Sequence, residues 1–538
     1  MKKTLLYCLA GFSAALLAAA EIRVNPGVPQ NLSPSGDDLA QLKKLTLGVG
    51  WEFSPNTETA SRLKEIGIRR IRCINVDLLP GSFDAKGNYV VDRTKTSRLD
   101  AHLATCRKLG AVPHIIIGQR LPKELAKEVR ADSDEGRVLG LQRNLTAGPT
   151  DYGKYRNYQL AFFEHVLVTL GCRDAEFEAF NEPDIGGIPF PSEKPPARGS
   201  AEAYDAMLRL YREISAAARE FERRHPDMPF RLGGPALAWA FTFRFGSFNW
   251  GERFIQDVAR EKWKLDFIGV HYYGNISSLH GEYPANYPPF PEMLRSLKQA
   301  RDRFLPAVPI QINEWGPSYH VNSTEQAMVN ADHIGAAWSA EFLNTMLEQG
   351  VDDALYLVTT DQALSKDGKQ ENIWGWCSLF VNPNVYGKAY PKASFHLFRM
   401  ISMLEGKRVE STRSETLNSF AAADQATRKL RILVWNFGTR IPESGLPVET
   451  AAVRNAEIRV VDAAKFFGAA KVKMTRRLIS RNTGNAYQVW KDGGKLDVGN
   501  TALPVTDTGE FLLLDGELRF GLIFPSDSVG LIEFEAAK

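Results

Sequence analysis

The fold is indicated first by residues 177–184, Phe177-Glu178-Ala179-Phe180-Asn181-Glu182-Pro183-Asp184. In this stretch an apolar run ends in a polar pair and a proline. The apolar residues predict a buried strand, and Pro183 ends it because proline cannot donate a ladder hydrogen bond. Asn181 and Glu182 are therefore expected at the carboxyl end of a strand, where a barrel carries its functional residues. A second stretch, Pro309-Ile310-Gln311-Ile312-Asn313-Glu314-Trp315-Gly316, repeats the pattern of a strand that ends in Asn-Glu.

Strand-like runs alternate with amphipathic helical segments as far as residue 404. The eight runs cover residues 45–50, 68–74, 112–118, 177–182, 230–235, 265–273, 309–316 and 353–358. Alternation of this kind indicates a parallel sheet covered by helices, and eight repeats predict an α/β fold of the (β/α)8 TIM barrel type. A doubly wound open sheet is the alternative, but Gly48-Val49-Gly50 lacks the third glycine of a phosphate-binding turn.

The spacing of apolar residues changes after residue 404. Runs at 420–423, 429–435, 456–461 and 530–535 resemble short strands separated by turn residues. We therefore predict a barrel over residues 21–404 and a C-terminal β-sandwich over residues 405–538, which a lead-in strand near Ile22 could join.

The first twenty residues have the composition of an export signal. A basic start at Lys2 and Lys3 precedes an apolar core, and Ala18-Ala19-Ala20 is a small-residue cleavage site before Glu21. The sequence thus predicts an exported protein, periplasmic or secreted, with no membrane insertion after processing. The formal net charge of +3 falls to +1 without the two lysines, which does not favour nucleic acid as a partner.

The cysteines do not indicate a metal site. Those that follow the signal segment, Cys73, Cys106, Cys172 and Cys377, lack metal-ligand spacing and are too sparse for a disulfide scaffold. We expect buried free thiols, although some could pair in an oxidising compartment. The sequence predicts neither a metal nor an organic cofactor, and it is silent on oligomeric state.

Two glutamates at the mouths of two strands indicate a paired-carboxylate hydrolase. Cleaving a glycosidic bond needs a proton for the leaving oxygen and negative charge at the anomeric carbon, and two carboxyls can supply both. Glu182 and Glu314 end the fourth and seventh strands, which face each other across a barrel mouth. We therefore expect the separation of about 5–5.5 Å at which the configuration is retained, rather than the wider inverting separation.

Neighbouring residues suggest roles for the two carboxyls. Glu314 needs hydrogen-bond donors to stay ionised, and Arg72 and Tyr273 end nearby strands. Asn181 can donate to the sugar hydroxyl beside the reacting carbon. His271 and Trp315 are predicted to line the first sugar subsite.

These motifs resemble those of the retaining clan A glycoside hydrolases. The sequences around Asn181-Glu182-Pro183 and Asn313-Glu314-Trp315 are most similar to family 39, the β-xylosidase and α-L-iduronidase family. Further likeness lies in three other segments, which are Leu232-Gly233-Gly234-Pro235-Ala236-Leu237-Ala238, Leu265-Asp266-Phe267-Ile268 with His271-Tyr272-Tyr273, and Asn485-Ala486-Tyr487-Gln488-Val489-Trp490-Lys491.

The resemblance implies an oligosaccharide or glycoside substrate. It implies that Glu182 is the acid/base and Glu314 the nucleophile, and it places His271, Tyr273 and Arg72 in the site. The family usually has a histidine where this chain has Ile74, and the segment after Ile117 also departs from its pattern. Both departures fall at substrate-facing loops. The expected activity is exo-acting and β-xylosidase-like; an endo-glycanase and a non-catalytic carbohydrate-binding protein are the alternatives.

Overall fold

The protein is described by a computed structural model. It describes residues 20–33, 36–51, 57–74, 76–95, 97–122, 124–125, 148–185, 199–238, 249–275, 279, 288–320, 328–361, 374–414, 417–442, 444, 446–447 and 451–537. Nearly all of the predicted signal segment, residues 1–19, lies outside these ranges. No helix within the described ranges is long and apolar enough to cross a membrane.

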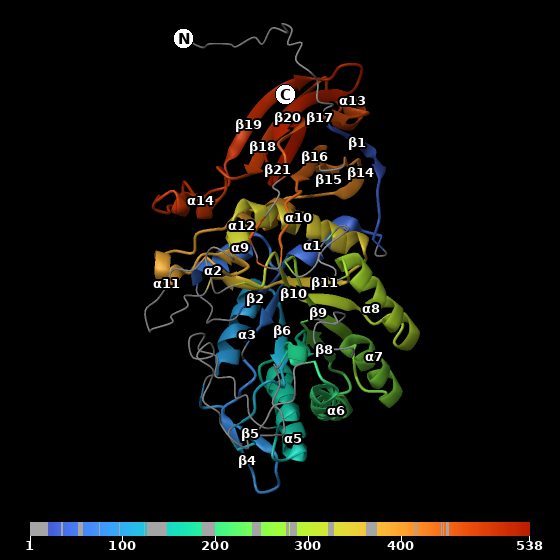
Figure 1. Cartoon of the computed structure of the whole chain (residues 1–538), viewed down its shortest axis with the longest axis vertical. Coiled ribbons are helices and arrows are strands. Elements are labelled where there is room, and N and C mark those ends of the chain that lie inside the picture. The colour runs from blue at the N-terminus through green and yellow to red at the C-terminus, as the bar shows by residue number, and fades with distance from the viewer. Residues whose placement is uncertain are drawn as a thin grey trace.

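Eight parallel strands close into a barrel, which confirms the predicted (β/α)8 fold (Figure 1). Around the barrel they are β2 (Gly48–Trp51), β3 (Arg70–Cys73), β6 (Val112–Ile117), β7 (Glu176–Ala179), β8 (Arg231–Leu237), β9 (Phe267–Tyr273), β10 (Ile310–Gly316) and β11 (Asp353–Tyr356). The ring is completed where Tyr356 of β11 pairs with Val49 of β2. This closure excludes the doubly wound open sheet.

Helices follow the barrel strands and cover them. They are α2 (Thr57–Glu65), α3 (Arg98–Leu109), α5 (Tyr152–Phe163) with its π-helical extension η1 (Glu164–Thr169), α6 (Ala201–Arg224), α7 (Trp250–Glu261), α8 (Phe290–Phe304), α10 (His333–Glu348) and α12 (Ala393–Ser402). Local sequence sets their ends: α3 begins with a capping box between Ser97 and Asp100 and ends at Gly110 in the left-handed conformation. An additional helix, α1 (Asp38–Thr46), precedes the first barrel strand.

Within the described residues, the connections contain three shorter helices and two small sheets. The helices are η2 (Pro183–Ile185), α9 (Met328–Ala331) and α11 (Pro383–Tyr386). The strands are β4 (Gly81–Phe83) with β5 (Tyr89–Val91), and β12 (Val358–Thr360) with β13 (Ser378–Phe380).

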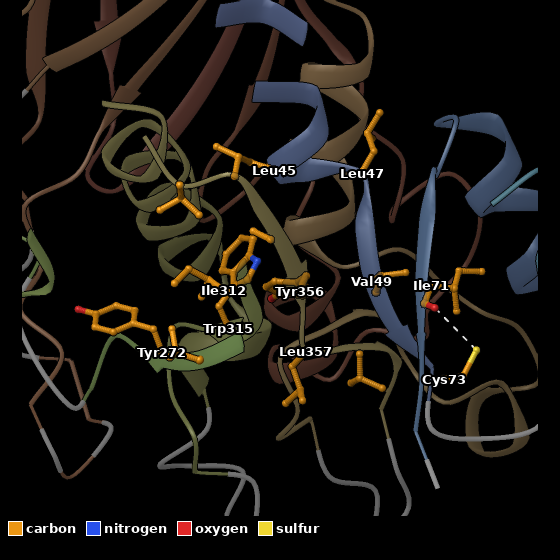
Figure 2. Close-up of a cluster of buried hydrophobic side chains, with 14 of the residues drawn as sticks. Leu45, Leu47, Val49, Ile71, Cys73, Tyr272, Ile312, Trp315, Tyr356 and Leu357 are labelled. Atoms are coloured by element: carbon orange, nitrogen blue, oxygen red, sulfur yellow. Dashed lines mark hydrogen bonds between the residues drawn. The ribbon is translucent and has the colours of Figure 1, made fainter. Parts of the chain in front are cut away.

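The outward faces of the barrel strands form an apolar layer against the helices. Figure 2 shows part of this layer, in which Trp315 and Tyr356 lie near Tyr272 and Ile312. The ring of Trp315 packs edge-on against Tyr356, with 4.8 Å between centroids. β10 has an irregular register between Ile312 and Trp315, and beyond it Trp315 lies on the helix side while Glu314 points into the barrel.

The second unit is a nine-stranded sheet in the order β19-β18-β21-β16-β15-β14-β1-β17-β20. Its strands are β1 (Ala20–Pro29), β14 (Lys407–Ser411), β15 (Leu417–Asp424), β16 (Lys429–Asn436), β17 (Arg454–Val460), β18 (Lys471–Ile479), β19 (Val505–Leu512), β20 (Leu518–Phe524) and β21 (Ser528–Ala536). The sheet curls over itself, since Phe520 of β20 packs against Phe534 of β21 at 5.5 Å. The result is the predicted β-sandwich, and β1 lies within it.

The sandwich rests on helices α1, α10 and α12 of the barrel (Figure 1). Trp435 donates its indole N–H to Glu341 of α10, and Arg408 forms a buried ion pair with Asp38 of α1. Two short helices, α13 (Ala463–Phe467) and α14 (Ala486–Lys491), complete this unit. The junction therefore combines apolar packing with buried polar contacts.

Candidate active site

The chain turns sharply where β7 ends. Phe180 and Glu182 have φ angles of +68° and +52°, in the left-handed region that residues with a Cβ rarely adopt. The backbone N–H of Glu182 donates to the carbonyl of Ala236 at 2.8 Å, and η2 begins at Pro183. Left-handed conformations at such residues cost free energy and gather at functional sites. The turn presents the partly exposed side chain of Glu182 at the barrel mouth.

Glu314 lies on β10 and is almost completely buried, with 8 % of the residue exposed. Its two carboxylate oxygens each accept a short hydrogen bond. The hydroxyl of Tyr273 donates to Oε1 at 2.5 Å, and Nη1 of Arg72 donates to Oε2 at 2.6 Å. The carboxylate is therefore held in one orientation by donors from β3 and β9, which lie on opposite sides of the barrel.

His271 of β9 connects the two glutamates. Its Nδ1 lies 3.0 Å from Oε1 of Glu182 and 3.6 Å from Oε1 of Glu314. A ligand atom from each of these three residues lies within 4.8 Å of the other two. The two carboxyls thus approach to the separation of retaining glycosidases, about 5–5.5 Å, which is too close for an interposed nucleophilic water.

The electrostatics favour an ionised Glu314. Burial raises the pKa of this carboxyl, but the charges of His271 and Arg72 and the hydrogen bonds from Tyr273 and Arg72 outweigh burial, so the pKa of Glu314 is lowered. Burial and the adjacent Glu314 raise the pKa of Tyr273 well above its usual range. Tyr273 is consequently a hydrogen-bond donor at neutral pH.

Burial would lower the pKa of His271, but the two carboxylates outweigh it and the pKa is raised. A protonated imidazole between two carboxyls reduces their mutual repulsion.

Arg72 of β3 is the central donor of the site, and only 1 % of it is exposed. Besides Glu314, its guanidinium donates to Oε2 of Glu178 at 2.7 Å and to Oδ1 of Asn181 at 2.7 Å. Because the carbonyl oxygen of Asn181 is engaged, its amide NH2 is the group left to face a ligand. Planar guanidinium geometry fixes all three acceptors relative to each other.

The structure brings six of the seven predicted site residues together, and the prediction for the seventh, Trp315, is wrong. Its ring is completely buried among Trp338, Phe342, Tyr356 and Phe398, on the helix side of β10 (Figure 2). The physical reason is local: the register shift of β10 between Ile312 and Trp315 sets which of its residues face inward, and it leaves Glu314 in the barrel and Trp315 against the helices. Trp315 is therefore a core residue and does not line a sugar subsite.

Sequence reasoning missed Glu178 and His114, which lie beneath Arg72. Both are fully buried, and Nε2 of His114 lies 3.2 Å from Oε2 of Glu178. A signal existed in the sequence: Glu176 and Glu178 stand two residues apart on a strand whose other face is apolar, so both must point into the barrel.

Two tryptophans, Trp374 and Trp376, follow the eighth barrel strand, and both are buried. Trp374 is fully buried against Tyr487 and Trp490 of α14, while Trp376 is 8 % exposed. The 485–491 segment thus forms a helix, capped by Asn485, that brings the sandwich against a barrel loop.

The cluster of Glu182, His271 and Glu314 has the mutual spacing that could surround a metal ion. Hydrogen bonds already occupy the groups, however, and the guanidinium of Arg72 neutralises the most buried carboxylate. A fixed cation at that position disfavours a second one. We therefore interpret the cluster as a hydrogen-bonded acid pair. The four cysteines within the described residues are free and buried.

Comparisons with known proteins agree with this architecture. No protein-family model matches the sequence. The chain is 23 % identical over 471 residues to a β-xylosidase of Geobacillus stearothermophilus, covering 82 % of this chain and 79 % of the relative.

Solved structures match over nearly the whole chain. A GH39 enzyme from Xanthomonas axonopodis pv. citri superposes with a TM-score of 0.72 at 18 % identity, covering 97 % of this chain and 98 % of the other. A monomeric β-xylosidase from Caulobacter crescentus CB15 gives 0.72 at 19 % identity, covering 97 % and 100 %. At these identities the structures establish the shared fold.

The closed barrel and its adjacent pair of carboxyls define a glycoside hydrolase. Within that class, the likeness in sequence and in fold confirms the resemblance to glycoside hydrolase family 39 that the motifs indicated.

Proposed function

We propose that the protein is an exo-acting, retaining β-glycosidase that resembles β-xylosidases, with Glu314 as the nucleophile and Glu182 as the acid/base. The observation that carries the proposal is the pair of carboxyls within 4.8 Å, of which only Glu314 is clamped by Arg72 and Tyr273. An ionised and immobile carboxylate suits attack, while the more exposed Glu182 can exchange protons with a leaving group and with water.

The geometry supports a double displacement. Glu182 gives its proton to the glycosidic oxygen as Glu314 attacks the anomeric carbon, which forms a glycosyl ester and releases the aglycone. Glu182 then takes a proton from an incoming water, which attacks the same carbon and frees Glu314. His271 orients Glu182 through the 3.0 Å contact, and the Asn181 amide donates to the sugar hydroxyl next to the reacting carbon.

The substrate class follows from the relatives. Two of them are named β-xylosidases, which supports a β-linked pentoside or a related glycoside as the substrate. Ile74 and the segment after Ile117 differ from the family pattern, so a panel of 4-nitrophenyl glycosides that includes β-xyloside, β-glucoside, α-L-arabinofuranoside and α-L-iduronide is the appropriate first screen.

Azide rescue tests the two assignments separately. We expect Glu182→Ala and Glu314→Ala each to lose several orders of magnitude in turnover while the proteins stay folded. Azide should restore turnover in both, giving the glycosyl azide of retained configuration with Glu182→Ala and of inverted configuration with Glu314→Ala. The exposed Glu292→Ala is a matched control that should behave as the unaltered protein.

Three results would contradict the proposal in whole or in part. Near-normal activity of either glutamate variant would remove that residue from the reaction. An NMR spectrum whose first-formed sugar has the opposite anomeric configuration would exclude a retaining mechanism. Internal cleavage of oligosaccharides, instead of release of single terminal sugars, would replace the exo-acting assignment with the endo-glycanase.

We further propose that the protein is exported to the periplasm or the medium. The basic start, apolar core and Ala18-Ala19-Ala20 site support this. Expression of the full chain in a bacterium, followed by fractionation and N-terminal sequencing, should give a mature protein that begins at Glu21. An intact Met1 in the cytoplasmic fraction would refute export.

A further inference from the structure

The interior of the barrel below the site is lined with charged side chains. TIM barrels usually fill this space with layers of branched apolar residues. Here two-residue spacing along two strands places Arg70 and Arg72 of β3 near Glu176 and Glu178 of β7, with His114 of β6 between them. All except Arg70 are buried. So many buried charges are costly unless each is paired.

We call these five residues, Arg70, Arg72, His114, Glu176 and Glu178, the charge chain. Ion pairs connect it to further residues at the floor of the barrel. Arg70 pairs with Asp353 of β11 and, at 3.3 Å, with Glu176. Arg231 of β8 also pairs with Glu176, and Nδ1 of His114 lies 3.3 Å from the other oxygen of that carboxylate. Glu176 is thus surrounded by cations on three sides.

His114 has a carboxylate at each ring nitrogen. Nδ1 faces Glu176 at 3.3 Å and Nε2 faces Glu178 at 3.2 Å. A neutral imidazole has one donor and one acceptor, so it can satisfy only one of these carboxylates, whereas the imidazolium donates to both. The geometry therefore defines His114 as a buried cation.

Glu178 connects His114 to Arg72 and so to the site. Its Oε2 accepts from Nε2 of His114 and from Nε of Arg72, so one oxygen receives both cations. The remaining nitrogens of the same guanidinium donate to Glu314 and Asn181. The position and effective charge of Arg72 consequently depend on Glu178 and His114.

We propose that Glu178 and His114 are positioning residues that act through Arg72 to set the ionisation of Glu314. The proposal rests on the proposed function for the role of Glu314 in catalysis. Neither residue contacts the reacting atoms: their part is to fix the cation that the nucleophile faces.

The other groups that face Glu314 are His271 and Tyr273 from β9, Glu182 from the turn after β7, and Cys377 from the segment before β13, and none of them is altered in the test. Among them His271 also touches the charge chain, because its Nε2 lies 3.3 Å from Nη2 of Arg72. His114 is faced by Glu176 and Glu178 and by the ring of Phe267, whose centroid is 5.2 Å away.

Two variants that each remove one charge should move the pKa of Glu314 in opposite directions. Glu178→Gln keeps an acceptor for Arg72 but removes a nearby negative charge, so Glu314 should ionise about one pH unit lower. His114→Gln removes the cation that balances Glu178, so Glu314 should ionise at higher pH. The double variant removes both charges, and its pKa should return towards that of the unaltered protein.

The pKa of Glu314 is measured by 13C NMR titration of the folded, carboxyl-labelled protein, with the resonance assigned by its loss in Glu314→Gln. The acid limb of kcat/KM is the second readout. Asp38→Asn is the matched control, because it breaks an equally buried ion pair, with Arg408, away from the barrel interior. It should lower stability without moving the pKa.

Opposite shifts in the two single variants, largely cancelled in the double variant, would support the proposal. Identical titrations in all variants, or shifts of one sign, would overturn it and leave the charge chain a purely structural feature. If one single variant fails to fold, the other decides between these outcomes: a shift of its predicted sign supports the coupling, and an unmoved titration or a shift of the opposite sign overturns it. The NMR titration needs no substrate, so absence of glycosidase activity would refute the proposed function alone.

Discussion

Replacing Tyr273 with phenylalanine removes one oxygen atom from the site and should change the pH dependence of the enzyme. The hydroxyl donates to Oε1 of Glu314 at 2.5 Å, and both residues are more than nine-tenths buried. A hydrogen bond to a charged group contributes about 1.5–3 kcal/mol. If most of that is specific to the ionised carboxylate, the pKa of Glu314 should rise by about one to two units, at about 1.36 kcal/mol per unit.

The assay is kcat/KM against pH with an aryl glycoside. Activity requires ionised Glu314, so the acid limb of Tyr273→Phe should move to higher pH by the same one to two units, and the plateau should fall about tenfold or more because the carboxylate loses one of its two clamps. Tyr272→Phe is the control: its ring lies one residue away on β9 but on the helix side, packed against Phe342 at 4.8 Å (Figure 2). It should leave the acid limb in place. An unmoved limb in Tyr273→Phe, with kcat/KM within twofold, would refute the reasoning.

Three further predictions concern stability. Trp315→Ala should cost about 3–5 kcal/mol in unfolding free energy because it empties a core site, yet leave KM unchanged, which denaturant titration and kinetics on the same sample can check. Lys392→Met leaves Asp361, its fully buried partner at 2.7 Å, without a counter-ion and should cost about 3–5 kcal/mol; the Asp361→Asn/Lys392→Met double variant should recover part of this loss in thermal melts. Burial raises the pKa of the Glu176 carboxyl, but His114 and two arginines outweigh burial and lower this pKa from 4.5 to about 2. A carboxyl whose pKa is lower in the folded than in the unfolded protein stabilises the fold at pH values above the unfolded pKa. That stabilisation is lost as the pH falls through the folded pKa, so the melting temperature should decline between about pH 4.5 and 2. A flat profile in that window would contradict the assignment.

The barrel could be predicted because its strands are short apolar runs at regular spacing. Each of the eight predicted runs contains or overlaps a strand, from β2 at Gly48–Trp51 to β11 at Asp353–Tyr356. The Asn181-Glu182 pair follows the end of β7, as predicted, whereas Asn313-Glu314 lies within β10, which continues to Gly316; both glutamates still meet in one site. In the sandwich the sequence indicated β15, β16, β17 and β21. The charged residues of β18 interrupt its apolar positions, and most residues of β19 and β20 are exposed or half-buried, so these strands lack a clear apolar run.

The site was less predictable because its residues were interpreted one at a time. The chemistry of Trp315 suits a sugar subsite, but the register shift of β10 between Ile312 and Trp315, which no sequence pattern records, leaves its ring on the helix side. Glu178 was passed over because it lies inside an apolar run. Which partner a buried charge finds depends on side chains more than 60 residues away in sequence, as for His114 and Glu178, and no local pattern records that pairing.

The place of β1 has a consequence for how the protein is made. This first described strand pairs in parallel with β17 and antiparallel with β14, so its two neighbours leave the ribosome only after the whole barrel has been synthesised. Until then Ile22 and Val24, which end up completely buried, have no partner strands to cover them. The sandwich can therefore form only once the chain is complete. In a protein truncated after the barrel, β1 would lack both partner strands and could pair with the sheets of other molecules.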